Sequence, residues 1–206
     1  FYGDLKYKPK LLILFSGKRK AGKDFLADAL LANYSVELLQ WKMNIFRLGD
    51  ETTQILRISE PIKKHWASKN NLKIDELLGS GPMKEQHRKD MILWSEEVRK
   101  QIPAFFCVDA FRSASKPIII VSDVRRRTDM DFFTCLNIPL LAVRINASDE
   151  EREKRGWIFT KGVDDVASEC DLDEFREWDF VINNDMESNA EHIFQNISCY
   201  VENVLQ

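Results

Sequence analysis

Four cations and a carboxylate gather at a glycine-bracketed turn near the start of the chain. The segment Gly17-Lys-Arg-Lys-Ala-Gly22-Lys23 satisfies the phosphate-loop pattern G-x-x-x-x-G-K, and Asp24 stands where serine or threonine is usual. The glycines let successive backbone amides point at phosphate oxygens, and the N-terminus of a following helix adds positive partial charge. Residues 17–24 therefore predict a nucleotide-binding P-loop, in which Lys23 reaches the terminal phosphates.

The carboxylate at Asp24 has two interpretations. It could be a first-turn acid that the helix dipole favours. Alternatively, it could ligate Mg²⁺ directly or through water, with Lys18, Arg19 and Lys20 compensating its charge. We favour the magnesium interpretation because these three additional cations are otherwise unexplained.

A second group of charged residues follows the apolar run Ile118–Val121. Asp123 stands where a nucleotide-binding strand often ends in an acid, so it is a second candidate Mg²⁺ ligand. Arg125 and Arg126 could contact phosphate through bidentate hydrogen bonds. In an open parallel sheet, ligands bind at the carboxyl ends of the strands. The alternative is a solvated, charged turn.

Other cations could hold an anionic acceptor. Lys84, Arg88 and Arg99 are spaced to lie on about the same side of a predicted helix over 82–101, although such a stripe is equally typical of a solvated face. Lys63, which follows the second predicted strand, is a further candidate or a plain surface lysine.

The charged segment 149–168 could be a lid. Arg152 and Arg155 are three residues apart and share a helix face, and Arg144 ends the preceding strand at the same rim. An arginine-bearing lid suits a kinase, because stray water would otherwise hydrolyse ATP. The alternative is a mobile charged loop.

The elements that must position these residues alternate between strands and helices. Short apolar runs predict buried strands, and helical spacing of apolar residues predicts the helices between them. Such alternation implies an α/β fold with parallel strands and right-handed crossovers. The predicted strands span 11–15, 55–58, 117–121, 140–145 and 178–182, and the clearest helices span 23–32, 62–69, 82–101 and 190–205. Residues 33–54 have no clean period and are expected to form an insertion.

Composition narrows the class of protein. A chain of 206 residues suits one domain, and 44% hydrophobic with 31% charged residues is typical of globular proteins. A net charge of −3 argues against a nucleic-acid-coating protein, and no apolar run approaches the length of a membrane span. The four cysteines have no metal-ligand spacing, so we expect reduced thiols in a cytosolic protein.

Taken together, four segments resemble the animal-type phosphomevalonate kinase family. They are FSGKRKAGKD (15–24), KEQHRKDMILWSEE (84–97), VSDVRR (121–126) and RGWIFTKGVDDVASECDLD (155–173). The resemblance extends from residue 11 to about 185 and is weakest over 33–54. It is far more specific than the P-loop alone.

The resemblance implies a P-loop NTPase-like, three-layer α/β/α fold with a five-stranded parallel sheet and a small mobile lid. One kinase domain would cover 1–206, with the P-loop at 17–24, an acceptor-binding region at about 60–103 and the lid at about 149–168. The implied reaction converts ATP and (R)-5-phosphomevalonate to ADP and (R)-5-diphosphomevalonate, with Mg²⁺, in the mevalonate route to isoprenoids and sterols.

The resemblance also implies residue roles. The residues implied to act in catalysis are Lys18, Arg19, Lys23, Asp24, Arg125 and Arg126. Those implied to bind ATP are Gly17, Lys18, Arg19, Lys20, Ala21, Gly22, Lys23, Asp24, Arg144 and Asn184. Those implied to bind phosphomevalonate are Arg125, Arg126 and Arg155, with Lys63, Lys84, Arg99 and Arg152 as weaker matches. Arg88 is a further candidate from its spacing on the predicted helix. The candidate Mg²⁺ ligands are Asp24 and Asp123.

We expect direct in-line transfer without a covalent enzyme intermediate or a general base, because a phosphate dianion is already a competent nucleophile. The alternatives are a nucleoside monophosphate or related small-molecule kinase, and a non-catalytic nucleotide-binding switch. We expect a monomer that binds neither nucleic acid nor membrane. The sequence ends in Val-Leu-Gln, where some relatives carry a peroxisomal tripeptide, so the cytosol is the expected location.

Overall fold

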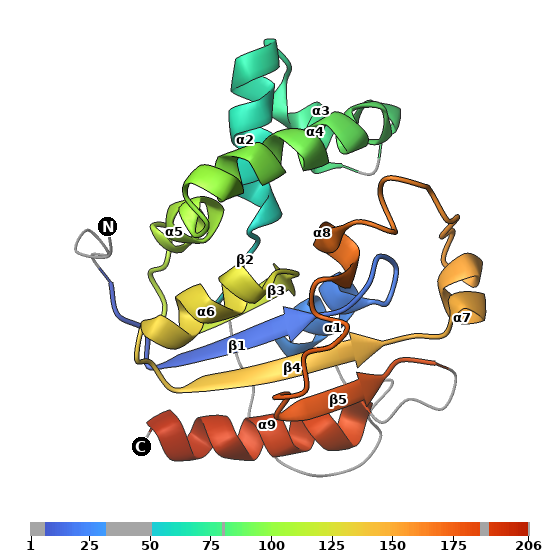
Figure 1. Ribbon diagram of the computed structural model, residues 1–206. Coiled ribbons are helices and arrows are strands. Elements are labelled where there is room, and N and C mark those ends of the chain that lie inside the picture. The colour runs from blue at the N-terminus through green and yellow to red at the C-terminus, as the bar shows by residue number, and fades with distance from the viewer. Residues whose placement is uncertain (1–6, 32–50, 80, 186–189, 206) are drawn as a thin grey trace.

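A five-stranded sheet forms the centre of the computed structural model, which describes residues 7–31, 51–79, 81–185 and 190–205. Its strands lie in the order β2-β3-β1-β4-β5, and all neighbouring pairs are parallel (Figure 1). The strands are β1 (Leu11–Ser16), β2 (Thr53–Leu56), β3 (Ile118–Val124), β4 (Leu140–Asn146) and β5 (Phe180–Asn183). The predicted α/β fold with a five-stranded parallel sheet is confirmed.

The central strand β1 determines where the P-loop lies. All six of its residues are buried, as expected for a strand covered on both faces. Ser16 at its end is in register with Val124 of β3 on one side and with Arg144 of β4 on the other. Parallel pairing thus brings the P-loop, the residues after Val124 and the end of β4 to the same edge of the sheet.

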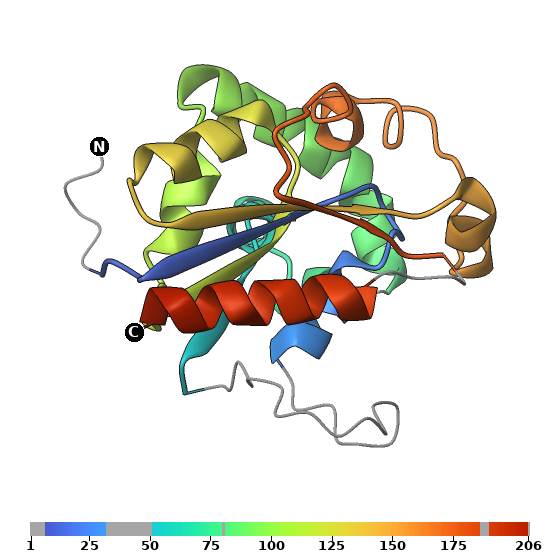
Figure 2. The same cartoon turned by 90° about the horizontal axis from the view of Figure 1, so that it is seen from below.

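Helices cover both faces of the sheet (Figures 1 and 2). On one face, α1 (Lys23–Leu31) and α9 (Ala190–Leu205) pack Leu26 and Ile197 into a cluster with Ile13 of β1. On the other, α5 (Phe105–Phe111) and α6 (Arg127–Cys135) supply Phe106 and Phe133 to a cluster that contains Leu14. This is the three-layer arrangement expected from the sequence.

A group of three helices projects beyond one end of the layers. It contains α2 (Ser59–Asn70), α3 (Ile74–Leu78) and α4 (Pro82–Gln101) and is called the helical group below (Figure 1). Trp66, Leu77 and Met91 form its own small core. Helix α4 has the predicted bounds: proline begins it and Pro103 follows its end.

The segment between β4 and β5 contains two short helices, α7 (Asp149–Lys154) and α8 (Ala167–Cys170). The hydroxyl of Ser148 caps α7 by accepting the backbone N–H of Glu151 at 3.3 Å. Both helices lie near the P-loop end of the sheet (Figure 1). The predicted lid, residues 149–168, therefore lies beside the predicted nucleotide site.

Several predicted boundaries are wrong. Strand β3 ends at Val124 instead of residue 121, and β5 begins at Phe180 instead of residue 178. Strand β2 begins at Thr53 and ends at Leu56, so residues 53 and 54 belong to the sheet rather than to the predicted insertion. Helix α2 begins at Ser59 instead of residue 62, because Asp123 binds backbone amides at its start. Residues 32–50 of the predicted insertion lie outside the described residues.

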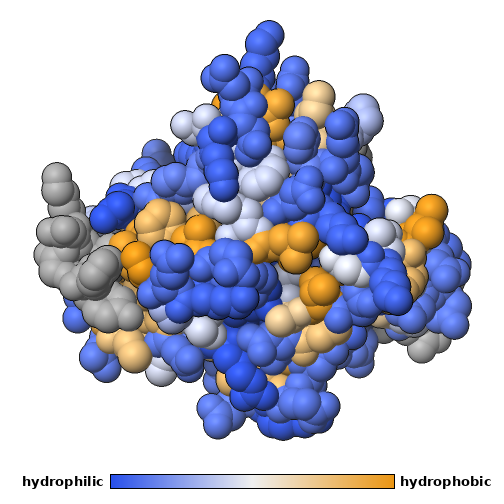
Figure 3. Space-filling view, turned by 45° about the horizontal axis from the view of Figure 1, so that its top comes forward, coloured by the Kyte–Doolittle hydropathy of each residue, from blue (hydrophilic) through white to orange (hydrophobic). Residues whose placement is uncertain are grey.

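The surface is mainly hydrophilic on the face shown in Figure 3, where hydrophobic residues form small separate patches. In the described part of the chain, no helix has both the length and the apolar character needed to cross a membrane. The cysteines are free thiols, and one of them, Cys107, is buried.

Candidate active site

The P-loop joins β1 to α1 through a backbone that requires glycine at both ends. Gly17 and Gly22 have φ values of +156° and +96°. A Cβ atom at Gly17 would lie 2.3 Å from the carbonyl oxygen of Ile145, and one at Gly22 would lie 2.2 Å from the Asn184 amide nitrogen. The two glycines therefore let the loop pack against the ends of β4 and β5.

Lys23 turns back into the loop. Its Nζ donates hydrogen bonds to the carbonyl oxygens of Gly17 at 2.7 Å and Lys18 at 2.8 Å, and the residue is only 6% exposed. Burial, and next the nearby charge of Arg125, lower the pKa of the Lys23 amine well below its usual range. An anionic ligand would therefore strongly favour the charged amine.

Asp24 has an ion-pair partner that the sequence reasoning missed. Its side chain is 69% exposed, and its Oδ1 lies 3.4 Å from Nε of Arg57, which directly follows β2. The Ser122 hydroxyl lies at the same distance from Oδ1, and Arg57 also pairs with Asp28 at 3.6 Å. The signal available in the sequence was a cation near the end of the second predicted strand. These contacts leave the Asp24 carboxylate accessible, and its role as a magnesium ligand stays a prediction.

Asp123 connects the end of β3 to the helical group. Its two oxygens accept the backbone N–H groups of Ile58 at 2.7 Å and Ser59 at 2.9 Å, at the start of α2. The negative charge thus lies where the helix dipole favours it. Asp123 also acts electrostatically on Lys23, which places it near the P-loop. Its role as a magnesium ligand stays a prediction.

Asp129, which the sequence reasoning missed, fixes the backbone that carries the arginine pair. It is 1% exposed, and its Oδ2 accepts the N–H groups of Arg125 and Arg126, each at 3.1 Å. The available signal was an acid in the first turn of a helix directly after the two arginines.

The side chains of the two arginines diverge. Arg126 is buried and pairs with Glu96 of α4. Arg125 instead pairs with Glu169 of α8 and donates to the carbonyl oxygen of Ser168 at 3.2 Å. Arg125 is thus the member of the pair that faces the P-loop side, whereas Arg126 joins α4 to the sheet.

The basic residues of α4 have different surroundings along the helix. Arg99 donates to Oδ1 of Asp129 at 2.7 Å and lies 5.4 Å from the ring centre of Phe106, so it anchors α4 to the sheet layers. Arg88 pairs with Glu85 on the same helix. The predicted common side of Lys84, Arg88 and Arg99 therefore does not bring all three to one site.

Lys63 and Lys84 face the P-loop from the helical group. Burial is the main cause that lowers the pKa of both amines. A nearby positive charge lowers each pKa further: the charge of Lys84 acts on Lys63, and the charge of Arg88 acts on Lys84. The negative charge of Asp24 acts in the opposite direction and raises the pKa of both amines. Within the described ranges, neither lysine has a carboxylate at ion-pair distance.

The lid arginines bind carbonyl oxygens of the P-loop. Nε of Arg152 donates to the oxygen of Arg19 at 2.9 Å, and its guanidinium lies 3.8 Å from the ring centre of Trp157. Arg155 donates to the oxygen of Ala21 at 3.2 Å, which also accepts a hydrogen bond from the Asn184 amide at 2.9 Å. These residues therefore join the lid and the end of β5 to the nucleotide loop.

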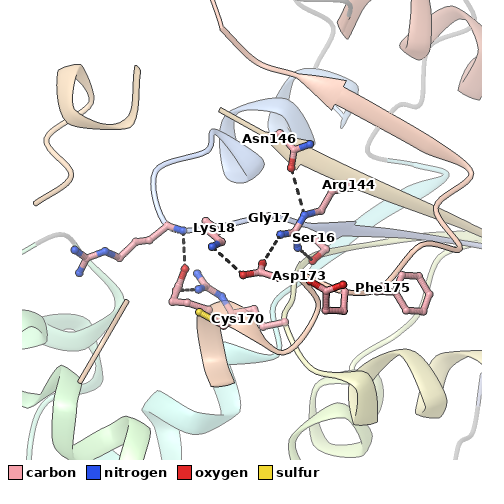
Figure 4. Close-up of polar contacts among 12 residues, drawn as sticks. Ser16, Gly17, Lys18, Arg144, Asn146, Cys170, Asp173 and Phe175 are labelled. Atoms are coloured by element: carbon pink, nitrogen blue, oxygen red, sulfur yellow. Dashed lines mark hydrogen bonds and ion pairs between the residues drawn. The ribbon is translucent and has the colours of Figure 1, made fainter. Parts of the chain in front are cut away.

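Acids from the lid and the residues after it pair with the P-loop cations, an arrangement that the sequence reasoning also missed. Asp173 lies between Lys18 at 2.9 Å and Arg144 at 3.1 Å (Figure 4). Arg144 also donates to the Ser16 hydroxyl at 3.1 Å, and Asp164 pairs with Arg19 at 3.1 Å. The available signal was the acidic run from 164 to 173, which matches the excess of positive charge in the loop.

A cavity of about 400 Å³ lies between the P-loop, the end of β4 and the lid. Three cations, two acids and two aromatic rings line it: Lys18, Arg144, Arg152, Asp149, Asp164, Trp157 and Phe159. Its volume and mixed lining suit part of a small charged ligand.

Two comparisons with known proteins identify the family of this chain. A family model described as phosphomevalonate kinase matches residues 15–138, more than half of the chain. A curated phosphomevalonate kinase of Drosophila melanogaster is 44% identical over 189 residues, which cover 88% of this chain and 92% of that protein. The chain belongs to the phosphomevalonate kinase family. The resemblance and the kinase class inferred from the sequence motifs are thereby confirmed.

A solved structure, the crystal structure of APE1195, aligns with 97% of this chain and 99% of its own at 19% identity and a TM-score of 0.43. A similarity at that level adds nothing on the activity of this member of the phosphomevalonate kinase family.

Proposed function

We propose that the protein transfers the γ-phosphate of ATP to (R)-5-phosphomevalonate, giving ADP and (R)-5-diphosphomevalonate. Membership of the phosphomevalonate kinase family supports this reaction. The observation that carries it in the structure is the register of Ser16 with Val124, which sets the P-loop beside Arg125 at one edge of the sheet. A nucleotide site and an anion site are thus adjacent, as transfer between two phosphates requires.

The residues divide into two sets around the transferring group. Lys18, Arg19 and Lys23 neutralise the phosphates of ATP, while Arg125 meets the acceptor phosphate. Lys63 and Lys84 hold the remaining negative charge of the acceptor from the helical group. An oxygen of the acceptor phosphate attacks the γ-phosphorus in line, the bond to the β-phosphate oxygen breaks, and ADP leaves. No side chain has to remove a proton from a phosphate dianion.

The carboxylates beside the P-loop suit a magnesium ion that is coordinated mainly by the phosphates of the nucleotide. Mg²⁺ usually keeps several waters and binds one or two carboxylates plus substrate phosphates. Asp24 is accessible, and Asp123 acts on the same lysine. No group of three or more His, Cys, Asp or Glu residues suited to a metal occurs among the described residues, so a shell completed by phosphates and water is the arrangement that fits. Bound Mg²⁺ would supply further neutralisation of phosphate charge.

The lid would exclude water during transfer. Arg152 and Arg155 bind the P-loop carbonyls, so the lid can cover the nucleotide and limit hydrolysis of ATP. We further propose a cytosolic monomer that acts on small molecules, and light scattering on a sizing column would test the monomer.

A coupled assay of ADP release tests the reaction directly. We expect turnover with ATP and (R)-5-phosphomevalonate, and ³¹P NMR should show a new diphosphate ester. A panel of nucleoside monophosphates should give no comparable rate. Phosphorylation of a nucleotide without phosphorylation of phosphomevalonate would contradict the proposal, and the absence of turnover with every acceptor would instead favour a nucleotide-binding switch.

A further inference from the structure

The carboxylate of Glu169 binds donors on both sides of the candidate site. Its Oε2 accepts the backbone N–H of Arg19 in the P-loop at 2.8 Å, and its other oxygen pairs with the guanidinium of Arg125. The side chain is only 5% exposed. A single buried anion therefore joins the nucleotide loop to the arginine of the acceptor side.

These donors are the kind that bind a phosphate group. P-loop amides bind phosphate oxygens, and an arginine binds phosphate and carboxylate with the same planar set of N–H groups. We propose that the Glu169 carboxylate occupies a phosphate position, and that a phosphate group of a substrate displaces it to bind. This inference rests on the proposed phosphate-transfer site and adds a residue that competes with the substrates for it.

The neighbouring acid Asp164 differs from Glu169 in its contacts. Asp164 accepts hydrogen bonds from Trp157 Nε1 at 3.1 Å and from the Thr160 N–H at 2.8 Å, both within the lid. It therefore stabilises the lid as well as pairing with Arg19. The contacts of the Glu169 carboxylate go instead to the P-loop and to Arg125, far away in the sequence.

The Glu169 carboxylate has to move when a phosphate group binds, because the two anions repel each other. A phosphate group bound to the Arg19 amide and Arg125 would be in contact with the Glu169 carboxylate, and two buried anions in contact repel strongly. Asp173 repeats the pattern more weakly, because it pairs with Lys18 and Arg144 but is 33% exposed. Binding energy of the substrate phosphates would then be used partly to break these ion pairs.

The test compares Glu169→Gln with Glu174→Gln by isothermal titration calorimetry. Glutamine keeps the shape and one acceptor oxygen but removes the charge. Glu174 is a matched control, because it is an exposed acid of the same segment that pairs with Arg176. The ligands are a non-hydrolysable ATP analogue with Mg²⁺, MgADP, and (R)-5-phosphomevalonate, each added to the intact protein.

We expect Glu169→Gln to bind a phosphate ligand about 3- to 10-fold more tightly than the natural protein, because the competing anion is gone. Tighter binding of the ATP analogue but not of ADP would assign the position to the γ-phosphate. Tighter binding of phosphomevalonate alone would assign it to the acceptor phosphate. Unchanged or weaker binding of all three ligands would overturn the proposal and leave Glu169 as a residue that only holds Arg125 in place.

A second variant covers the case in which Glu169→Gln does not fold, as judged by circular dichroism. Asp173→Asn should tighten binding of the ATP analogue in the same direction but by less, about 2-fold, because its ion pairs are more exposed. No tightening in that variant would then count against the proposal. Since the readout is binding, a protein that fails to phosphorylate phosphomevalonate but shows tighter nucleotide binding would refute only the proposed function.

Discussion

The P-loop cations and the two lysines of the acceptor side balance their positive charge in opposite ways. On the nucleotide side, Lys18 pairs with Asp173 and Lys23 binds two carbonyl oxygens of its own loop. On the acceptor side, Lys63 and Lys84 have no ion pair within the described residues, and burial lowers the pKa of each amine. Lys18 and Lys23 are thus pre-organised by the protein, and so is Arg125 through its pair with Glu169, whereas Lys63 and Lys84 rely on the charge of their ligand.

This difference has a physical consequence for mutants. Removing a cation that the protein itself binds also leaves partners without a hydrogen bond, so both structure and catalysis should suffer. Removing a cation that awaits a ligand should mainly weaken binding of that ligand.

Lys23→Met should cause the largest loss. Because Lys23 is the buried cation of the P-loop, we expect kcat for phosphomevalonate to fall about 1,000-fold. The ADP-release assay measures this loss, and Lys100→Met, an exposed lysine paired with Glu97, is the control. A loss below about 10-fold would show that the P-loop lysine does not stabilise the transferring phosphate.

Arg126→Met should mainly destabilise the fold. The change leaves Glu96, which is 33% exposed, without its buried partner, and loss of such a charged hydrogen bond costs about 2 kcal/mol. Urea unfolding should show this loss of unfolding free energy. If stability is instead unchanged while the KM for phosphomevalonate rises, Arg126 binds substrate, as predicted from the sequence.

Lys84→Met should act on the acceptor alone. We expect the KM for phosphomevalonate to rise about 10-fold, with little change in kcat, in the KM for ATP or in stability, because no ion pair is lost. Steady-state kinetics with each substrate varied in turn separates these effects. An equal rise in both KM values would remove the distinction between the two sides.

Acceptor binding should take up protons at alkaline pH. The lowered pKa values leave Lys63 and Lys84 partly neutral below the ordinary lysine value of about 10.4, and a bound anion restores the charged form. Without ligand, the unfolded chain binds more protons in this window, so stability should rise with pH there. Calorimetry in buffers of different ionisation enthalpy measures the uptake, which should be larger at about pH 9 than at about pH 7. Equal uptake in Lys84→Met would contradict this assignment.

Asp24→Ser should have the smallest effect on stability. The exposed pair with Arg57 contributes less than about 1 kcal/mol. The magnesium concentration required for half-maximal rate should nevertheless rise if the carboxylate supports the metal. An unchanged magnesium titration would favour the helix-dipole interpretation, and Arg57→Gln provides a control for loss of the ion pair alone.

The parts of the fold that the sequence predicted well have local signals. The apolar run before Gly17, the glycine spacing of the P-loop and the bounds of α4 can all be read from neighbouring residues. Asp129 also had a local signal, as a first-turn acid beside the arginine pair.

The remaining parts depend on contacts between distant segments. Glu169 and the amide of Arg19 are 150 residues apart, and no periodicity connects them. The helical spacing correctly predicted the side of α4 on which Arg99 lies, but it did not predict which residues Arg99 contacts. The helix passes from the helical group to the sheet layers, so residues on one side meet different neighbours along its length.

Because α4 extends from the helical group to the sheet layers, a rotation of the helix about its end at the sheet would be amplified at its other end. The end at the sheet is fixed by Arg99 and Asp129, and Lys84 lies fifteen residues away, about 22 Å along the axis. A turn of about 10° around the fixed end would carry the Lys84 amine about 4 Å. Such a rotation would move Lys84 relative to the P-loop. It would turn about two contacts that join the helical group to the sheet, the Arg99–Asp129 pair and the hydrogen bonds of Asp123 to the start of α2.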